Sequence, residues 1–155
     1  MRGNYILFGG LQMTAEQVIP SISKQRITPF LTFSGNAEEA MNYYVRTFPN
    51  SKIVSLRRIT KEDRGEEGKV LNGIIEILGQ TFMVLDMEKE SCPKFTWAVS
   101  FYIECKDEAE FDLIFNGLKG DGQVLMGPVE MYDFSKVTWV TDCFNVTWQL
   151  VLRKS

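Results

Sequence analysis

The chain of 155 residues contains no histidine. Imidazole is the usual base that activates a serine or cysteine nucleophile, and it is a common ligand of zinc, iron and nickel. Its absence excludes a Ser-His or Cys-His catalytic system. A general base would have to be a carboxylate, a lysine or a tyrosine whose pKa is shifted by its surroundings.

Cysteine is also scarce, and the chain has no excess of positive charge. The three cysteines, Cys92, Cys105 and Cys143, are odd in number, and two of them lie in strand-like apolar stretches. This pattern predicts buried, reduced thiols in a reducing compartment, and therefore a cytoplasmic protein. The net charge of −3 supplies no basic surface for nucleic acid or an anionic membrane, so a neutral or weakly polar small molecule is the better partner.

No apolar run approaches the length of a membrane span. The apolar stretch 6–11 is too short, and too weakly flanked by positive charge, for a secretory signal. Residues 1–26 differ in pattern from the rest of the chain and are interpreted as an N-terminal extension of uncertain structure. The alternative is an ordinary docked strand or helix. The remaining length suits one domain with one buried core.

From residue 27 the pattern becomes regular. A β-rich stretch, 27–33, leads through a turn to Asn36, which can cap a helix. Apolar residues then recur at three- and four-residue spacing as far as Phe48, which predicts a helix. Strands are predicted at 52–60, 69–78 and 80–86. The mixed-charge stretch 61–68 predicts a solvated hairpin loop, with a lid over a site as the alternative.

The second half repeats this order. A strand is predicted at 97–105, a helix capped by Asp107, and strands at 123–130, 134–141 and 146–152. The helix starts, Asn36 and Asp107, lie 71 residues apart. We therefore predict one α+β domain over 27–153, made of paired βαβββ modules at about 27–88 and 96–153 that form cupped mixed β-sheets around a cleft.

Several short segments carry a family resemblance. They are Ile27-Thr28-Pro29-Phe30-Leu31, Gly35-Asn36-Ala37-Glu38-Glu39-Ala40, Tyr43-Tyr44, Phe48-Pro49-Asn50-Ser51, Leu78-Gly79-Gln80-Thr81-Phe82 and Val146-Thr147-Trp148-Gln149-Leu150. In this order they resemble the PhnB-like family, also called the 3-demethylubiquinone-9 3-methyltransferase domain family. That family belongs to the vicinal oxygen chelate superfamily, with glyoxalase I, the bleomycin-resistance proteins and extradiol dioxygenases. The resemblance implies the paired fold, a cleft in each cupped sheet and a homodimer, but no particular reaction.

The resemblance also implies where the superfamily holds its metal. Matching strand to strand places those positions near Thr28, Met83, Ser100 and Gln149. Hydroxyl, thioether and amide groups are poor ligands for zinc, iron or nickel, so we predict neither a metal nor another cofactor. The alternative is a metal-dependent lyase, isomerase or dioxygenase in which carboxylates such as Glu76 and Glu104 are recruited.

Methyl transfer, as in the family label, is the weaker alternative. A fold that binds S-adenosylmethionine usually has a parallel sheet with a glycine-rich turn after its first strand, and no such turn is present. Lone carboxylates such as Asp86, Asp133 and Asp142 lie at predicted strand ends or turns, where turn formation or solvation is the ordinary role. Cys105, on a β-rich segment, is predicted to pack in the core rather than to act as a nucleophile.

What remains is a predicted cleft with aromatic walls and a few hydrogen-bonding tips. Alternation along the strands puts Thr28, Phe30 and Thr32 on one face, and Ser100 and Tyr102 on another. With Met83, Trp148 and Gln149, these are the predicted ligand-binding residues, and they suit a flat or amphipathic small molecule. Two alternatives stay open: Phe30, Phe82 and Trp148 could be plain core, or the cleft could be filled by its own side chains.

Overall fold

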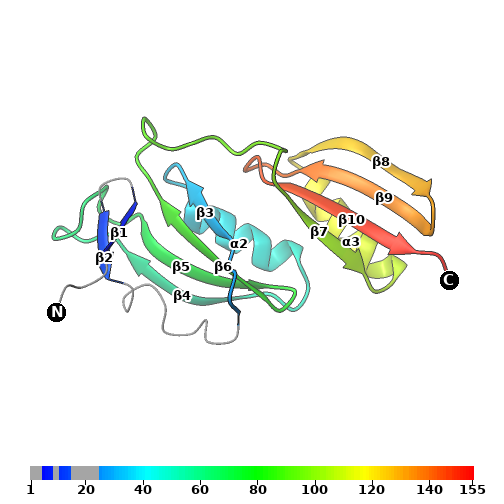
Figure 1. The fold of residues 1–155 in the computed structure, drawn as a ribbon, viewed down its shortest axis with the longest axis horizontal. Coiled ribbons are helices and arrows are strands. Elements are labelled where there is room, and N and C mark those ends of the chain that lie inside the picture. The colour runs from blue at the N-terminus through cyan, green and yellow to red at the C-terminus, as the bar shows by residue number, and fades with distance from the viewer. Residues whose placement is uncertain (1–4, 9–10, 15–24) are drawn as a thin grey trace. The chain divides into compact units, whose positions relative to one another are not determined.

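The computed structural model describes residues 5–8, 11–14 and 25–155. Its contacts divide the chain into two units (Figure 1). The first is formed by described residues as far as Arg46 and by Asn50–Pro93, and the second by Thr47–Pro49 and Lys94–Ser155. Most of the predicted extension 1–26 lies outside the described residues. Within it, β1 (Tyr5–Phe8) and β2 (Leu11–Thr14) pair as an antiparallel hairpin.

The first unit contains one helix and a four-stranded sheet. Its elements are β3 (Phe30–Phe33), α2 (Ala37–Thr47), β4 (Lys52–Arg58), β5 (Val70–Ile77) and β6 (Gln80–Asp86). The strand order is β3-β6-β5-β4, in which β3 runs parallel to β6 and the other two pairs are antiparallel. All five elements of the first predicted half are therefore present, with ends that differ by a few residues.

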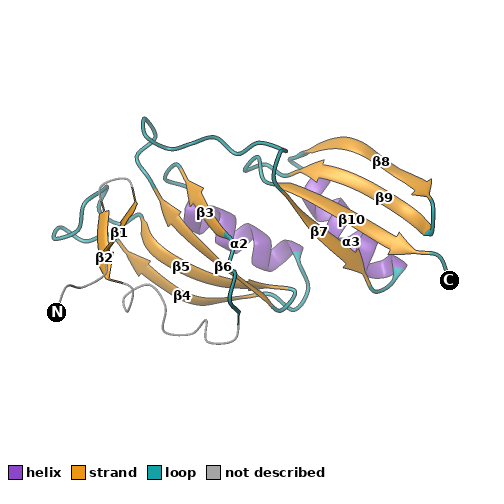
Figure 2. Cartoon of the chain, viewed as in Figure 1, coloured by secondary structure: helices purple, strands orange, loops and turns teal. Residues whose placement is uncertain are grey.

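The second unit repeats this arrangement. Its elements are β7 (Ser100–Cys105), α3 (Glu108–Lys119), β8 (Gln123–Met131), β9 (Phe134–Thr141) and β10 (Thr147–Arg153). The order β7-β10-β9-β8, with β7 parallel to β10, matches the first sheet strand for strand (Figure 2). The predicted α+β class and the two βαβββ modules are confirmed.

Close packing against α2 fixes which face of the first sheet is covered by a helix. A side-chain carbon at Gly73 would lie 2.7 Å from the sulfur of Met41 in α2 and 2.7 Å from Val84 in β6. Gly73 is paired with Val84, so both residues face α2. Because side chains alternate along a strand, the neighbours of Gly73 on β5 face away from the helix.

The two helices begin in different ways. Asp107 caps α3 as predicted, since its side chain accepts a hydrogen bond of 2.8 Å from the backbone nitrogen of Glu110. At α2 the backbone nitrogen of Ala37 donates instead to the buried carboxylate of Asp86, at 2.8 Å. The other oxygen of Asp86 accepts from the nitrogen of Val70, at 2.9 Å. One acid therefore ties the start of α2 to the start of β5.

No helix in the described part of the chain is long and apolar enough to cross a membrane. The described cysteines are all free thiols. Cys105 is buried as predicted and Cys92 is half-buried, but the prediction of burial is wrong for Cys143, which is exposed. Its position explains the difference, because it lies in the turn between β9 and β10 rather than within a strand.

Candidate functional site

The sheet of the second unit has one face toward α3 and one face away from it. Lys136 of β9 makes ion pairs of 2.8 Å with Glu108 and 2.9 Å with Asp112, which fixes the side of β9 that faces the helix. Trp139 lies three residues after Lys136 on β9, an odd number, and its side chain therefore points away from α3. It is paired with Gln149 of β10, and Gln149 is paired with Tyr102 of β7.

We call this surface the aromatic face of the second sheet, defined by Ser100, Tyr102, Trp139 and Gln149. Tyr102 is 56% exposed, and the other three residues are half-buried. The indole ring of Trp97, which is 66% exposed, lies 6.4 Å from that of Trp139 in a tilted arrangement. The face therefore presents ring surfaces from two strands and from the segment before β7.

A hydrogen bond orders the polar groups of the aromatic face. The Gln149 side-chain nitrogen donates to the Ser100 hydroxyl oxygen at 2.6 Å. A serine hydroxyl that accepts in this way keeps its own hydrogen free to donate, and the amide oxygen of Gln149 is left as an acceptor. The pair thus presents the Ser100 hydroxyl hydrogen and the second amide hydrogen of Gln149 as donors beside the Gln149 amide oxygen as acceptor, without a net charge.

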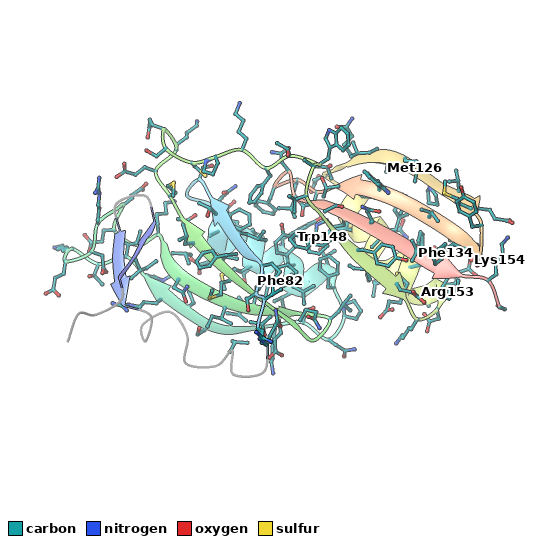
Figure 3. The ribbon with its side chains drawn as sticks, viewed as in Figure 1. Phe82, Met126, Phe134, Trp148, Arg153 and Lys154 are labelled. Atoms are coloured by element: carbon teal, nitrogen blue, oxygen red, sulfur yellow. The ribbon has the colours of Figure 1, made fainter. Side chains whose placement is uncertain are left out.

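Charges at the far end of these strands are paired. Arg153 of β10 donates to Glu104 of β7 at 2.6 and 3.3 Å. The hydrogen bond to Glu104 also raises the pKa of Arg153. The guanidinium stands 5.1 Å from the ring centre of Phe134, and Figure 3 shows the two side chains next to each other. Glu104, one of the two carboxylates considered as a metal ligand, is therefore held in an ion pair.

Trp148 lies on the opposite side of β10 from Gln149. It is 1% exposed, and its ring centre lies 4.6 Å from that of Phe48 and 5.2 Å from that of Phe101. Its ring nitrogen donates to the buried carboxylate of Asp142 at 2.9 Å. These contacts place Trp148 in the core of the second unit, as the plain-core alternative expected. Its predicted contact with a ligand is not tested by them.

The predicted site residues of the first unit lie mostly on the sheet face away from α2. Phe30 is paired with Met83, and Met83 with Ile74. Thr32 lies on the same face two residues beyond Phe30, and Thr28 is half-buried two residues before β3. Buried aliphatic side chains form a cluster here, and Phe30 packs against it: Ile59, Leu71, Ile74 and Met83.

Sequence analysis missed three residues on these faces. Trp97 and Trp139 belong to the aromatic surface of the second unit. Alternation along β9 gives the residues that share a face with Trp139. It does not show that Gln149 of β10 lies beside Trp139, which depends on how the two strands pair. In the first unit, the amide nitrogen of Asn72 is buried without a hydrogen-bond partner. No pattern in the sequence indicated that this polar side chain would be buried.

The residues that the resemblance places near the superfamily's metal positions are poor ligands for zinc, iron or nickel. Thr28, Met83, Ser100 and Gln149 offer neutral hydroxyl, thioether and amide groups. Glu76 makes an ion pair of 3.2 Å with Lys52. Within the described part of the chain, no group of three or more histidine, cysteine, aspartate or glutamate side chains could hold a metal ion.

The other candidate groups have structural surroundings. One carboxylate oxygen of Asp142 accepts from the backbone nitrogens of Phe144 and Val146, at 2.8 and 3.0 Å, which confirms a turn-forming role. Cys105 is 4% exposed, and burial raises the pKa of its thiol to about 12, with smaller contributions from nearby acids. A thiol with so high a pKa is a poor nucleophile, as its predicted core position implies.

Solved structures identify the class of fold. A protein from Pseudomonas aeruginosa is 20% identical and aligns over 85% of this chain and 100% of its own, with a TM-score of 0.74. The fosfomycin resistance protein FosX from Listeria monocytogenes is 9% identical and aligns over 84% of this chain and 92% of its own, with a TM-score of 0.58. The fold is therefore of the glyoxalase and bleomycin-resistance type.

Two closer matches identify the family. The family model described as 3-demethylubiquinone-9 3-methyltransferase matches residues 25–151. The PhnB protein from Bacillus cereus is 41% identical over 83% of this chain and 99% of its own, with a TM-score of 0.76. The chain therefore belongs to the PhnB-like family. No curated protein matches it.

Proposed function

We propose that the protein binds a flat, uncharged small molecule on the aromatic face of the second sheet, without a metal ion. The observation that supports this most directly is the Gln149–Ser100 hydrogen bond beside the exposed ring of Tyr102. Rings supply apolar contact to a planar ligand, and the ordered donor and acceptor fix its orientation. Glu104, the carboxylate on this face, is paired with Arg153.

The ligand class follows from the polar pair. A planar ring with a carbonyl acceptor next to an N–H donor complements the Ser100 hydroxyl and the Gln149 amide oxygen. A cyclic amide has this edge, and carbostyril is a convenient probe. Coumarin has the same shape but replaces the N–H with an ether oxygen, so it can make only one of the two hydrogen bonds. We expect coumarin to bind about tenfold more weakly.

The test is equilibrium dialysis of carbostyril and coumarin against the protein. Tyr102→Ala removes a ring from the face, and Gln149→Leu removes the acceptor. Each should weaken carbostyril binding about tenfold, and Gln149→Leu should abolish the preference over coumarin. Tyr132→Asn is the matched control, because Tyr132 is 86% exposed and lies in the turn between β8 and β9. Failure of carbostyril to bind, or equal weakening by the control, would refute the proposal.

Native mass spectrometry with metal analysis separates this proposal from the metal-dependent alternative. A metal-free protein that carries a copurified small molecule supports binding without a metal and identifies the ligand by mass. Stoichiometric zinc, iron, nickel or manganese would favour a lyase, isomerase or dioxygenase instead. Methyl transfer has less support, because each four-stranded sheet contains only one parallel pair of strands.

We also infer that the protein is a cytoplasmic homodimer. The free thiols of the described cysteines fit a reducing compartment. β8 is an edge strand of the second sheet, and Val124, Leu125 and Val129 on it are exposed. Exposed apolar side chains on an open edge favour a partner chain. The mass of the intact assembly in the same native spectrum gives the number of chains, and a monomer at micromolar concentration would contradict the inference.

A further inference from the structure

The first unit contains a cavity of about 280 Å³, and none of the predicted ligand residues is in its lining. Three segments line it: the turn 34–35, the loop 59–69 between β4 and β5, and the segment 85–91 at and after the end of β6. These segments meet at one end of the first sheet, where β3, β4 and β6 end and β5 begins (Figure 2). Most of the charged stretch 61–68 is exposed to solvent, and its residues 64–66 also line the cavity.

Hydrogen bonds hold the walls of this cavity in place. The amine of Lys69 donates to the carbonyl oxygen of Gly35 at 2.9 Å, which joins the loop to the turn. Asp86 ties both neighbouring elements through its two backbone hydrogen bonds. Within the loop, Asp63 accepts from the nitrogen and the hydroxyl of Thr60, at 2.8 Å each, and these bonds lower the pKa of Asp63. A cavity fixed in advance loses less entropy when a ligand binds.

The floor is apolar and the walls carry both signs of charge. Ile59 and Leu85 are each 4% exposed and form apolar lining. The basic side chains on the walls are Arg64, Lys69 and Lys89, and the acidic ones other than Asp86 are Glu66 and Glu88. Lys69 bonds a neutral carbonyl, so that contact leaves its charge uncompensated. Asp86 accepts one backbone nitrogen on each of its oxygens, and the two glutamates are the other carboxylates on the walls.

We propose that this cavity binds a small zwitterion, an α-amino acid with an aliphatic side chain. The carboxylate would be held by Lys69 and Lys89, and the ammonium group by Glu66 and Glu88. The side chain would lie against the apolar floor. The volume is below the usual range for drug-sized ligands, about 300–1,000 Å³, and suits a molecule the size of leucine. This site is independent of the aromatic face and makes no use of its residues.

The experiment is isothermal titration calorimetry with three probes of one carbon skeleton. L-Leucine has both charges, isocaproate lacks the ammonium group, and isopentylamine lacks the carboxylate. The proposal expects leucine to bind at least about tenfold more tightly than either analogue, since each analogue leaves one set of charged partners unused. Absence of leucine binding would overturn the site. Equally tight binding of isocaproate would overturn the zwitterion and leave only an anion site.

Matched variants connect the binding to the cavity. Lys89→Ala and Glu66→Gln remove charges from its walls, and each should weaken leucine binding about fivefold to tenfold. Lys61→Ala and Glu67→Gln remove exposed charges from the same loop outside the cavity, and both should leave the affinity unchanged. Far-UV circular dichroism checks that each variant folds. If the control variants weaken binding as much as the wall variants, leucine is not bound in this cavity.

Discussion

The two units share one strand order but differ in the sheet face that points away from the helix. In the first unit Ile74 and Met83 on this face are 2% and 7% exposed. In the second unit Tyr102 on the corresponding face is 56% exposed. Val137 and Val151, on the central strands of this same face, are 8% and 3% exposed, so both faces are closed at their centre. They differ in the aromatic and polar side chains that the second sheet adds at Tyr102, Trp139 and Gln149. The difference lies in the alternate residues of the strands, so the topology alone does not determine which face is available to a ligand.

The units also use a buried aspartate differently. Asp86 bonds residues 49 and 16 positions away in sequence and joins two elements of the first unit. Asp142 bonds residues at most six positions away and orders the turn between β9 and β10, together with the Trp148 ring. The first acid is a long-range connection and the second a local one.

Intrinsic fluorescence can separate the two units in experiments. All three tryptophans, Trp97, Trp139 and Trp148, belong to the second unit. Tryptophan emission therefore follows the second unit alone, whereas far-UV circular dichroism follows helices and strands of both. Unfolding in urea with both signals can therefore assign a change in stability to one unit or the other.

The largest effect should come from Trp148→Ala. Removal of this buried ring leaves a cavity between Phe48 and Phe101 and takes the ring N–H donor from one oxygen of the buried Asp142 carboxylate, so we expect a loss of about 4 kcal/mol in the free energy of unfolding. Urea unfolding followed by circular dichroism gives the value. The exposed Tyr132→Asn variant should stay within about 0.5 kcal/mol of the parent. A loss below about 1 kcal/mol for Trp148→Ala would contradict its core position.

Replacement of the two buried acids should follow. Asp86→Asn and Asp142→Asn each put an amide nitrogen opposite a hydrogen-bond donor, and each should cost about 3 kcal/mol. Asp142→Asn should lower the fluorescence midpoint at least as much as the circular dichroism midpoint, because its partners belong to the second unit. If either variant loses less than about 1 kcal/mol, that acid does not stabilise its unit as described.

Gly73→Ala should be less harmful and should affect the first unit. The added carbon would lie 2.7 Å from both Met41 and Val84, so these buried side chains must shift, at a cost of about 2 kcal/mol. Val84→Ala in the same chain removes one of the two clashes and should recover part of the loss, which a double-mutant cycle measures. Strictly additive losses would show that the contact with Val84 does not limit packing there.

The smallest effect should be the pH dependence from an exposed ion pair. Hydrogen bonds from Arg58, one of 2.7 Å, hold the pKa of Glu38 below its ordinary value. A lowered folded pKa adds stability above the ordinary value, and this stability is lost as the pH falls through the folded pKa. Glu38→Gln should therefore flatten the decline in melting temperature below about pH 5, by less than about 2 °C.

Glu130→Gln is the matched variant in the second unit, since Lys154 lowers the pKa of Glu130 in the same way. Equal slopes for both variants and the parent would show that neither pair contributes.

Sequence patterns predicted the elements well because burial sets their period. Buried apolar residues recur every three to four positions in α2. In the strands they alternate with polar residues or form a continuous run, and the predicted ends of β6 and β9 match those of the structure. The capping of α3 was also predictable, because Asp107 and its partner Glu110 are three residues apart. The offset of the two halves then indicated the repeated module.

Contacts between distant residues could not be predicted in this way. Asn36 was expected to cap α2, but the acid that bonds the first helical nitrogen is Asp86, from the end of β6. Trp148 and Gln149 were both predicted to contact a ligand because they are adjacent in sequence. Their side chains point to opposite sides of the sheet, and Trp148 is buried in the core. The cavity walls come from three loops whose proximity depends on strand order.

Three residues at the end of α2 bear on how separable the two modules are. Thr47–Pro49 belong to the second unit, although the chain on either side of them belongs to the first. Dividing the chain between Pro93 and Lys94 would separate the two sequence repeats. The C-terminal fragment would then lack Phe48, whose ring packs against Trp148. The sequence repeat and the packed unit therefore have different boundaries. A fragment that carries only the second repeat lacks the Phe48 ring that fills part of its core.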